Sequence, residues 1–175
     1  MDALAIGRGD RIADVGSGQG YFSFLRARRV GAEGKVYAVD IDEKSLEGLE
    51  VRAAELDLDQ IETVIGADDD PRLPEGKLDT ILVVDTYHEI RGHEGMMEGM
   101  FGALAPGGRL AIVDIPGQLG KQREEYHERH RIPVEAVIED AADAGFRLDS
   151  FDPEFAGQPA GRRFYLVVFS KPTAS

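Results

Sequence analysis

The 175-residue sequence contains no cysteine, and this absence excludes several kinds of chemistry. Without thiols the chain forms no disulfide, offers no thiolate to a metal ion, and has no cysteine nucleophile. Long hydrophobic runs are also missing, because no apolar stretch approaches the roughly 20 residues that span a bilayer. The first residues, Met1 to Leu4, lack the basic start and apolar core of a signal peptide. We therefore expect a cytoplasmic protein with no membrane segment.

Positive charge is scarce as well. The chain has 20 lysines and arginines against 33 acidic residues, which gives a formal net charge of −13. A nucleic-acid partner requires cationic surface that displaces counterions from phosphates, so this balance disfavours one. A local basic patch on an acidic protein stays open as an alternative.

What is present is the alternation of short apolar runs with helical patterns, which is typical of a parallel sheet with crossover helices. The length fits one domain over residues 1–175. We expect parallel strands at 11–15, 35–40, 61–65, 78–84 and 109–115. We expect helices at 21–30, 43–56, 94–104 and 133–144. Two final β runs, 146–151 and 163–170, have no crossover helix between them and predict an antiparallel pair at one edge of the sheet.

The clearest motif is Asp14-Val15-Gly16-Ser17-Gly18-Gln19-Gly20, which joins the first strand to the first helix. Three alternate glycines allow a sharp turn and a close approach of the backbone to a ligand. Ligands of open α/β sheets bind in this crevice, beyond the carboxyl ends of the strands. Asp40 ends the second strand and is suited to accept hydrogen bonds from the hydroxyls of a ribose. Together these features predict a nucleoside-type ligand.

The order and spacing of three segments resemble class I S-adenosylmethionine-dependent methyltransferases. The segments are residues 14–20, residues 39–42 (Val-Asp-Ile-Asp) and residues 104–110 (Leu-Ala-Pro-Gly-Gly-Arg-Leu). The resemblance implies a Rossmann-like α/β fold with a seven-stranded, mostly parallel sheet. Its strand order would be 3-2-1-4-5-7-6, with strand 7 antiparallel and helices on both faces. Because this cofactor carries a sulfonium cation and no phosphate, carboxylates suit its site better than a basic cradle.

The resemblance also implies roles for individual residues. Gly16, Gly18 and Gly20 would face the methionine portion of the cofactor, with Ser17 in the same turn, and Asp14 would help to hold the amino group. Asp40 would bind the ribose and Ile41 would pack on the adenine. The family places an acidic residue directly after a glycine beyond the third strand, whereas this chain has Gly66-Ala67-Asp68-Asp69-Asp70. The adenine contact is therefore open between Asp68 and Asp69, beside the alternative of a solvated acidic turn.

The fourth strand ends in Asp85-Thr86-Tyr87-His88-Glu89, where the family places the transferring methyl group. This stretch resembles the histidine-containing segment of small-molecule methyltransferases related to quinone-biosynthesis enzymes. We expect Asp85 to touch the cofactor, and Tyr87, His88 and Glu89 to contact the substrate. His88 is the predicted proton acceptor because an imidazole titrates near neutrality, and Asp85 is the second catalytic candidate. A structural histidine that orients a neighbour is the alternative for His88.

A second charged segment, residues 124–131, contains His127 and His130, which would share one face if the segment is helical. Covering the substrate pocket and forming a solvated helix are both open interpretations. We predict no metal site, because spacing fixes no third ligand. Only ten residues precede the first strand, where the family commonly has helices that close over the site. The site would then be open, or closed by helices absent from this chain, or covered by a second subunit or a partner.

These features predict transfer of a methyl group from S-adenosylmethionine to an oxygen, nitrogen or carbon atom of a small molecule. Two alternatives remain. The first is a non-catalytic module that binds the cofactor or a partner. The second is a nicotinamide-dependent oxidoreductase, although the third glycine comes one residue early for the dinucleotide pattern.

Overall fold

The computed structural model describes residues 4–155 and 163–173 of the chain. The strands are β1 (Arg11–Val15), β2 (Lys35–Asp40), β3 (Ile61–Ile65), β4 (Leu78–Val84), β5 (Leu104–Asp114), β6 (Arg147–Phe155) and β7 (Phe164–Ser170). The helices are α1 (Tyr21–Val30), α2 (Glu43–Glu55), the 3-10 helix η2 (Tyr87–Glu89), α3 (His93–Ala103), α4 (Arg123–Glu128) and α5 (Val134–Asp143).

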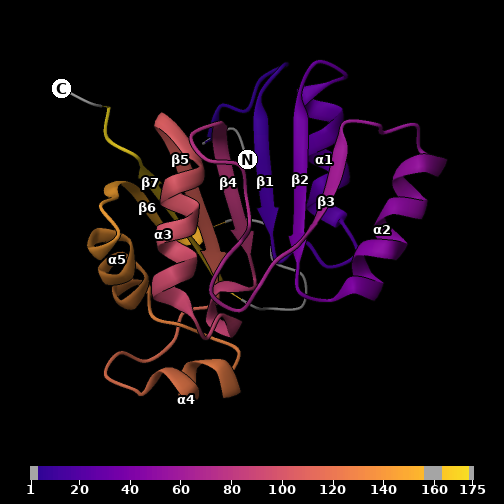
Figure 1. Ribbon diagram of the computed structural model, residues 1–175. Coiled ribbons are helices and arrows are strands. Elements are labelled where there is room, and N and C mark those ends of the chain that lie inside the picture. Colours follow the sequence, from indigo (N-terminus) through magenta and orange to yellow (C-terminus); the bar gives the residue numbers. More distant parts are fainter. Residues whose placement is uncertain (1–3, 156–162, 174–175) are drawn as a thin grey trace.

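All seven strands form one sheet in the order β3-β2-β1-β4-β5-β7-β6 (Figure 1). Strands β1 to β5 pair in parallel. Strand β7 runs antiparallel to both β5 and β6. The predicted fold class and strand order are therefore confirmed.

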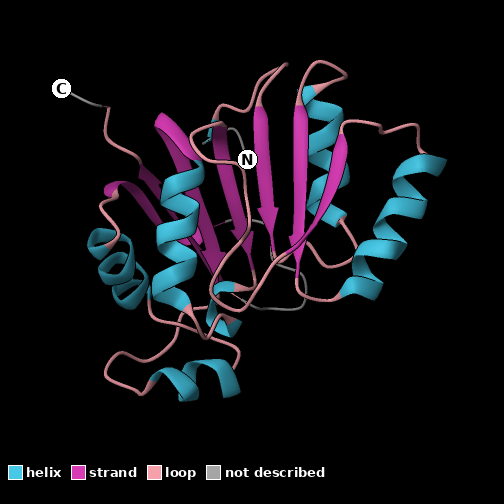
Figure 2. Ribbon diagram, viewed as in Figure 1, coloured by secondary structure: helices cyan, strands magenta, loops and turns pink. Residues whose placement is uncertain are grey.

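Helices lie on both faces of the sheet (Figure 2). Between the sheet and its helices lie two hydrophobic clusters of buried residues, one on each face. Helices α1 and α2 cover one face, where Ala27, Val30 and Leu49 are fully buried. Helices α3 and α5 cover the other face with Met97, Met100 and Val137 among their buried side chains. Burial on both faces explains the nearly continuous apolar run of β4. Within the described residues, no helix combines the length and the hydrophobicity that a membrane crossing requires.

Several element boundaries differ from the prediction. Strand β5 begins at Leu104 and not at Arg109, because Leu104 already pairs with Leu78 before an irregularity in the register. Pro133 is the N-cap of α5 and not its first helical residue. Strand β6 continues beyond residue 151 to Phe155 through two register shifts.

The carboxyl ends of β1, β2, β4 and β5 lie at one edge of the sheet, and η2 and α4 lie beyond this edge (Figure 1). At the opposite edge, Lys171 follows β7 and donates hydrogen bonds from Nζ to the carbonyl oxygens of Phe101 and Leu104, both at 2.8 Å. These carbonyls belong to the last turn of α3 and the start of β5. Lys171 therefore ties the end of the chain's last strand to the α3–β5 junction.

We predict that Lys171→Met lowers the free energy of unfolding by about 1–3 kcal/mol, because two carbonyl oxygens lose a charged donor. Chemical denaturation measures the change, and the exposed Lys77→Met serves as the control variant. Equal stabilities of the two variants would contradict this account of Lys171.

Candidate functional site

The glycine turn, residues 14–20, connects β1 to α1 with three left-handed glycines. Gly16, Gly18 and Gly20 have φ angles of 75°, 50° and 84°. A Cβ at Gly16 would meet the Thr86 side chain at 2.2 Å, and one at Gly20 would meet Leu49 at 2.7 Å. A Cβ at Gly18 would meet nothing within 4 Å. Gly16 and Gly20 are therefore needed for packing, whereas Gly18 borders open space.

Asp40, the last residue of β2, holds this turn in place. Its Oδ2 accepts a hydrogen bond from the Gly18 backbone N–H at 2.7 Å, and its Oδ1 accepts one from the Asp42 N–H at 3.0 Å. Asp42 in turn caps the N-terminus of α2 through the Lys44 N–H. The Asp40 carboxylate thus couples the end of β2 to the turn after β1.

A cavity of about 490 Å³, here called the glycine-turn cavity, opens between these two strand ends. It is lined by Val15, Gly16, Gly18, Val39, Asp40, Ile41, Gly66, Ala67, Asp68, Thr86, Glu89, Ile90, Arg91, Met96 and His127. Five of the predicted cofactor-binding residues are among them: Gly16, Gly18, Asp40, Ile41 and Asp68.

The other predicted cofactor-binding residues lie elsewhere. Gly20 packs against Leu49, and the Asp69 backbone packs against the start of α3 at Gly92 and Gly95, so the geometry favours Asp68 over Asp69 at the cavity wall. Ser17 is nearly buried in the turn. Asp85 lines a neighbouring cavity, described below.

Asp14 lies behind the turn, only 2% exposed, and does not line the cavity. Its Oδ2 accepts a hydrogen bond from Ser23 Oγ at 2.6 Å. Burial raises the pKa of the Asp14 carboxyl from 3.8 to about 6, and the Ser23 hydrogen bond and the Arg26 charge offset part of that rise. This raised pKa means that the surrounding protein groups do not fully offset the desolvation of the Asp14 carboxylate. A cationic ligand nearby would therefore stabilise its ionised form.

The glycine-turn cavity fits an adenosine-bearing cation on three further observations. Ile41 is 64% exposed, which leaves a large apolar side chain free at the cavity wall to pack against a flat ring. Ser17 Oγ is buried and has no hydrogen-bond partner among the described residues. Asp40 and Asp68 add carboxylates to the wall. The cavity therefore offers apolar contact and negative charge, and the turn beside it holds an unsatisfied hydroxyl.

A second, adjoining cavity of about 710 Å³ lies beyond the ends of β4 and β5 and is here called the histidine cavity. It is lined by Asp85, His88, Glu89, Ile115, Pro116, Arg129, His130, Arg131 and Arg163. Glu89 lines both cavities. The two cavities thus share Glu89 of η2, directly after β4, as a common lining residue.

His88 is held at the wall of the histidine cavity by Asp114, the fully buried last residue of β5. The His88 ring nitrogen Nδ1 lies 2.7 Å from Asp114 Oδ1, and the His88 backbone N–H donates to Asp114 Oδ2 at 3.1 Å. Because a carboxylate can only accept, Nδ1 carries the hydrogen, and neutral His88 keeps its lone pair on Nε2.

Opposing effects act on the pKa of His88. Burial by itself lowers the pKa, but the hydrogen bond and the charge of Asp114, with the charges of Glu89 and Asp85, outweigh burial. The pKa of His88 is therefore raised above its ordinary value of 6.5.

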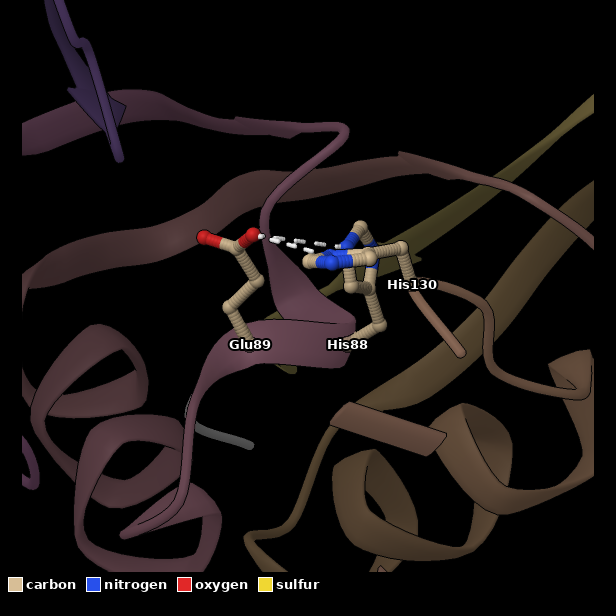
Figure 3. Close-up of side chains that lie close together, drawn as sticks. All are labelled: His88, Glu89 and His130. Carbon is tan, nitrogen blue, oxygen red and sulfur yellow. Dashed lines mark ion pairs between the residues drawn. The ribbon is translucent and has the colours of Figure 1, made fainter. Parts of the chain in front are cut away.

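Glu89 points from η2 toward two imidazoles, those of His88 and His130 (Figure 3). Its Oε1 lies 3.7 Å from His88 Nε2 and 3.3 Å from His130 Nδ1. The His88 and His130 rings meet edge to face with their centroids 5.5 Å apart. The structure thus brings His88, Glu89 and His130 to one cavity, and their contact with a substrate stays a prediction.

Two predicted placements are corrected. Helix α4 ends at Glu128 and His130 has a left-handed φ of 49°, so His127 and His130 do not share a helix face. His127 lines the glycine-turn cavity instead, with Nε2 3.2 Å from Arg91. Tyr87 is fully buried and donates its hydroxyl to Asp140 Oδ2 at 2.7 Å, so it lines neither cavity.

Ligand atoms of His88, Glu89 and His130 lie within 4.8 Å of one another, which is close enough to hold a metal ion. Asp85, His88 and Asp114 form a second such group. Spacing in the sequence did not reveal either group, because His88 and His130 come from different segments. The absence of a metal from this site stays a prediction.

Asp114 and the three arginines of the histidine cavity are not among the site residues predicted from the sequence. Asp114 carried a usable signal, because an acidic residue that ends a buried strand had already singled out Asp40. The arginines carried none, since Arg129 and Arg131 converge with Arg163 only in the folded chain.

The strand order, the glycine turn and the two adjoining cavities define the class of Rossmann-like methyltransferase folds. Comparisons with known proteins agree. Residues 6–152 match the family described as methyltransferase domain. A demethylmenaquinone methyltransferase of Listeria monocytogenes is 27% identical over 139 residues, which is 77% of this chain and 58% of that protein. The chain thus spans less than two thirds of the length of this relative.

Solved structures share the fold. A SAM-dependent methyltransferase of Aquifex aeolicus has a TM-score of 0.80 at 24% identity, covering 95% of this chain and 85% of that one. A geranyl diphosphate C-methyltransferase of Streptomyces coelicolor, solved with S-adenosyl-L-homocysteine, has a TM-score of 0.79 at 16% identity, covering 98% and 77%. The chain belongs to the methyltransferase domain family, and its resemblance to class I S-adenosylmethionine-dependent methyltransferases is confirmed.

The pKa of Asp14 generates a prediction about stability. Because the folded pKa of about 6 exceeds the ordinary 3.8, the folded state holds this proton more tightly. The protonated Asp14 carboxyl contributes to the free energy of unfolding in full below pH 3.8, and this contribution is lost as the pH rises through about 6. Asp14→Asn should therefore gain about 3 kcal/mol relative to the parent protein between pH 4 and pH 7.5.

Urea unfolding of both proteins at several pH values measures this difference, and effects of other titrating groups cancel in the comparison. A stability difference that stays constant from pH 4 to pH 7.5 would contradict the burial of an ionising Asp14.

Proposed function

We propose that the chain, as one domain over residues 1–175, transfers a methyl group from S-adenosylmethionine to a small-molecule acceptor. The observation that carries this proposal is the meeting of two cavities at Glu89. One of them contains the family's cofactor motif, and the other presents the His88–Asp114 pair. A donor in the first cavity would face an acceptor in the second.

The glycine-turn cavity would hold the cofactor. Asp40 would accept hydrogen bonds from the ribose hydroxyls, Ile41 would pack on the adenine, and Asp68 would read the adenine amino group. The backbone at Gly16 and Gly18 would approach the methionine portion, with Ser17 Oγ gaining a partner. Asp14 would act from behind the turn, where its buried charge favours the cofactor's cationic groups.

When bound, S-adenosylmethionine supplies an electrophilic methyl group, whose bond to sulfur breaks as the acceptor's nucleophilic oxygen, nitrogen or carbon bonds to the methyl carbon. The protein's contribution would be positioning, exclusion of water and removal of a proton. His88 would accept the acceptor's proton on Nε2, while Asp114 fixes the tautomer through Nδ1 and stabilises the imidazolium that forms. Asp85, at the same cavity wall, is the second candidate.

The acceptor would lie among His88, Glu89 and His130 in the histidine cavity. His127 would border the cofactor from the end of α4. Tyr87 would support η2 from the core through its hydrogen bond to Asp140. The Listeria relative, named for demethylmenaquinone, supports a small organic acceptor. The acidic composition disfavours nucleic acid. We further propose a cytoplasmic location and a second subunit or partner as the cover of the open site.

Calorimetry tests the cofactor assignment. We predict that S-adenosylmethionine and S-adenosylhomocysteine bind and that nicotinamide dinucleotides do not. Asp40→Ala should weaken binding by about 1.5–3 kcal/mol, the scale for losing a charge-assisted hydrogen bond. Because Asp40 also holds the Gly18 N–H, this variant should lose some thermal stability.

Asp42→Ala is the matched control, because Asp42 caps α2 next to Asp40 but lies outside the cavity lining. It should lower stability and leave cofactor affinity unchanged. Binding of nicotinamide dinucleotides in place of S-adenosylhomocysteine would refute the proposed function. Cofactor binding without turnover on any acceptor would favour the non-catalytic alternative.

The proton-acceptor role of His88 generates a second prediction. With a known acceptor, His88→Ala should lower turnover at least tenfold, and by up to ~10²–10⁴-fold if proton removal limits the chemical step. Affinity for S-adenosylhomocysteine should stay within about twofold, because the change affects the chemical step. In the parent protein, turnover should fall as pH falls through the raised pKa of His88, since the protonated ring cannot accept a proton.

His93→Ala is the control variant, since His93 lines neither of these cavities. Turnover in His88→Ala equal to that in His93→Ala would assign His88 a structural role.

A further inference from the structure

The histidine cavity carries a charge pattern opposite to that of the whole molecule. The chain has a net charge of −13, yet three of the nine lining residues found in the described part of the chain are arginines. They are Arg129, Arg131 and Arg163. The lining carboxylates are those of Asp85 and Glu89. Guanidinium groups therefore outnumber carboxylates here, before any charge on the two histidines is counted.

The three arginines reach the cavity from two parts of the chain. Arg129 and Arg131 flank His130 in the segment after α4, and Arg163 directly precedes β7. Segments more than thirty residues apart thus place cations around one space. A run of charges on one solvated helix would not produce this convergence.

The arginines' own acidic partners hold them weakly. Arg129 lies 3.5 Å from Glu125, and Arg163 lies 3.7 Å from Glu154, with both arginine side chains more than half exposed. Exposed ion pairs of this kind contribute little, so exchange of the carboxylate for a ligand costs little. Arg131 donates Nε to the Arg129 carbonyl oxygen at 3.3 Å, which orients its side chain beside Arg129.

The carboxylate of Glu89 is already engaged with two histidines. Its Oε1 is shared between His88 Nε2 and His130 Nδ1 (Figure 3). Among the described lining residues, three guanidinium groups thus accompany two carboxylates, and one of these carboxylates is bound to imidazoles.

We propose that the histidine cavity binds an anionic group of the methyl acceptor, a carboxylate or a phosphate, through Arg129, Arg131 and Arg163. Guanidinium forks match both anions because two parallel N–H groups meet two oxygens. This inference rests on the proposed function, since it assigns the acceptor to this cavity. It narrows the acceptor from any small molecule to an anionic one, whose charged end anchors it while the nucleophilic atom faces the glycine-turn cavity.

A divalent cation on His88, Glu89 and His130 would be the competing occupant. The three donor atoms lie within 4.8 Å of one another. However, a divalent cation there would share its cavity with three guanidinium charges, which repel it. The same charges attract an anion, so the arrangement favours the anionic acceptor.

The test is isothermal calorimetry on the full chain with inorganic phosphate and, separately, malonate as probes. Chloride compensates for ionic strength, and each titration is run with and without S-adenosylhomocysteine. We expect saturable 1:1 binding of at least one probe, with the tighter one indicating a phosphate or a carboxylate acceptor. Arg131→Gln and Arg163→Gln should each weaken it by about tenfold.

Arg52→Gln is the matched control, because Arg52 is an exposed arginine of α2 outside both cavities. It should bind the probes as the parent protein does. Failure of both probes to saturate overturns the proposal, as does equal affinity in Arg131→Gln, Arg163→Gln and Arg52→Gln. A zinc titration is the third experiment. If zinc binds 1:1, if His130→Ala abolishes this binding, and if neither anion binds, the proposal is overturned in favour of a metal site.

The S-adenosylhomocysteine titration separates this inference from the proposed function. Saturable cofactor binding with no anion binding refutes the anionic acceptor alone. Anion binding without cofactor binding refutes the methyltransferase and leaves an anion site whose ligand has another role.

Discussion

Parallel pairing of β1, β2, β4 and β5 is the constraint on which the site depends. The pairing aligns Val15 with Val39 and with Val83, so neighbouring strands end at the same level. The residues at or just beyond these ends then meet at one edge of the sheet, although they are far apart in sequence. The glycine turn follows β1, Asp40 ends β2, η2 follows β4 and Asp114 ends β5.

Two buried carboxylates at this edge are stabilised in different ways. Asp114 is fully buried and accepts hydrogen bonds from the His88 ring, the His88 backbone N–H and the Ile115 N–H. Asp14 accepts from Ser23 Oγ, and burial still raises its pKa to about 6. Asp114 therefore orients His88 through its hydrogen bonds, whereas Asp14 retains a charge that a bound cation would stabilise. An incompletely stabilised buried charge such as that of Asp14 is typical of sites where a ligand offsets the free-energy cost of burial.

Much of the sheet could be predicted from sequence because its central strands β1, β2 and β4 are buried on both faces. Strand β4 is a short apolar run with few polar interruptions, and the run alone sets its bounds. Strand β5 was harder, because Pro106-Gly107-Gly108 indicates a turn, whereas Leu104 already pairs with Leu78 across an irregular register. Pairing at a bulge depends on the neighbouring strand and not on local composition.

The site was predictable only where backbone geometry requires particular residues. The left-handed φ angles of the glycine turn demand glycine, so the motif is visible in sequence. Helical spacing placed His127 and His130 together, but a left-handed φ at His130 separates them, and a histidine gives no warning of that conformation. The convergence of Arg129, Arg131 and Arg163 is tertiary, and no local pattern encodes it.

A crystal structure of the protein with S-adenosylhomocysteine tests the central claim most directly. The account predicts the ribose hydroxyls on Asp40, the adenine against Ile41, and the thioether sulfur at the side of the glycine-turn cavity nearest Glu89. His88 Nε2 would then face the sulfur across the junction of the two cavities. Density for the ligand elsewhere on the molecule, or a sulfur directed away from the histidine cavity, would contradict the account.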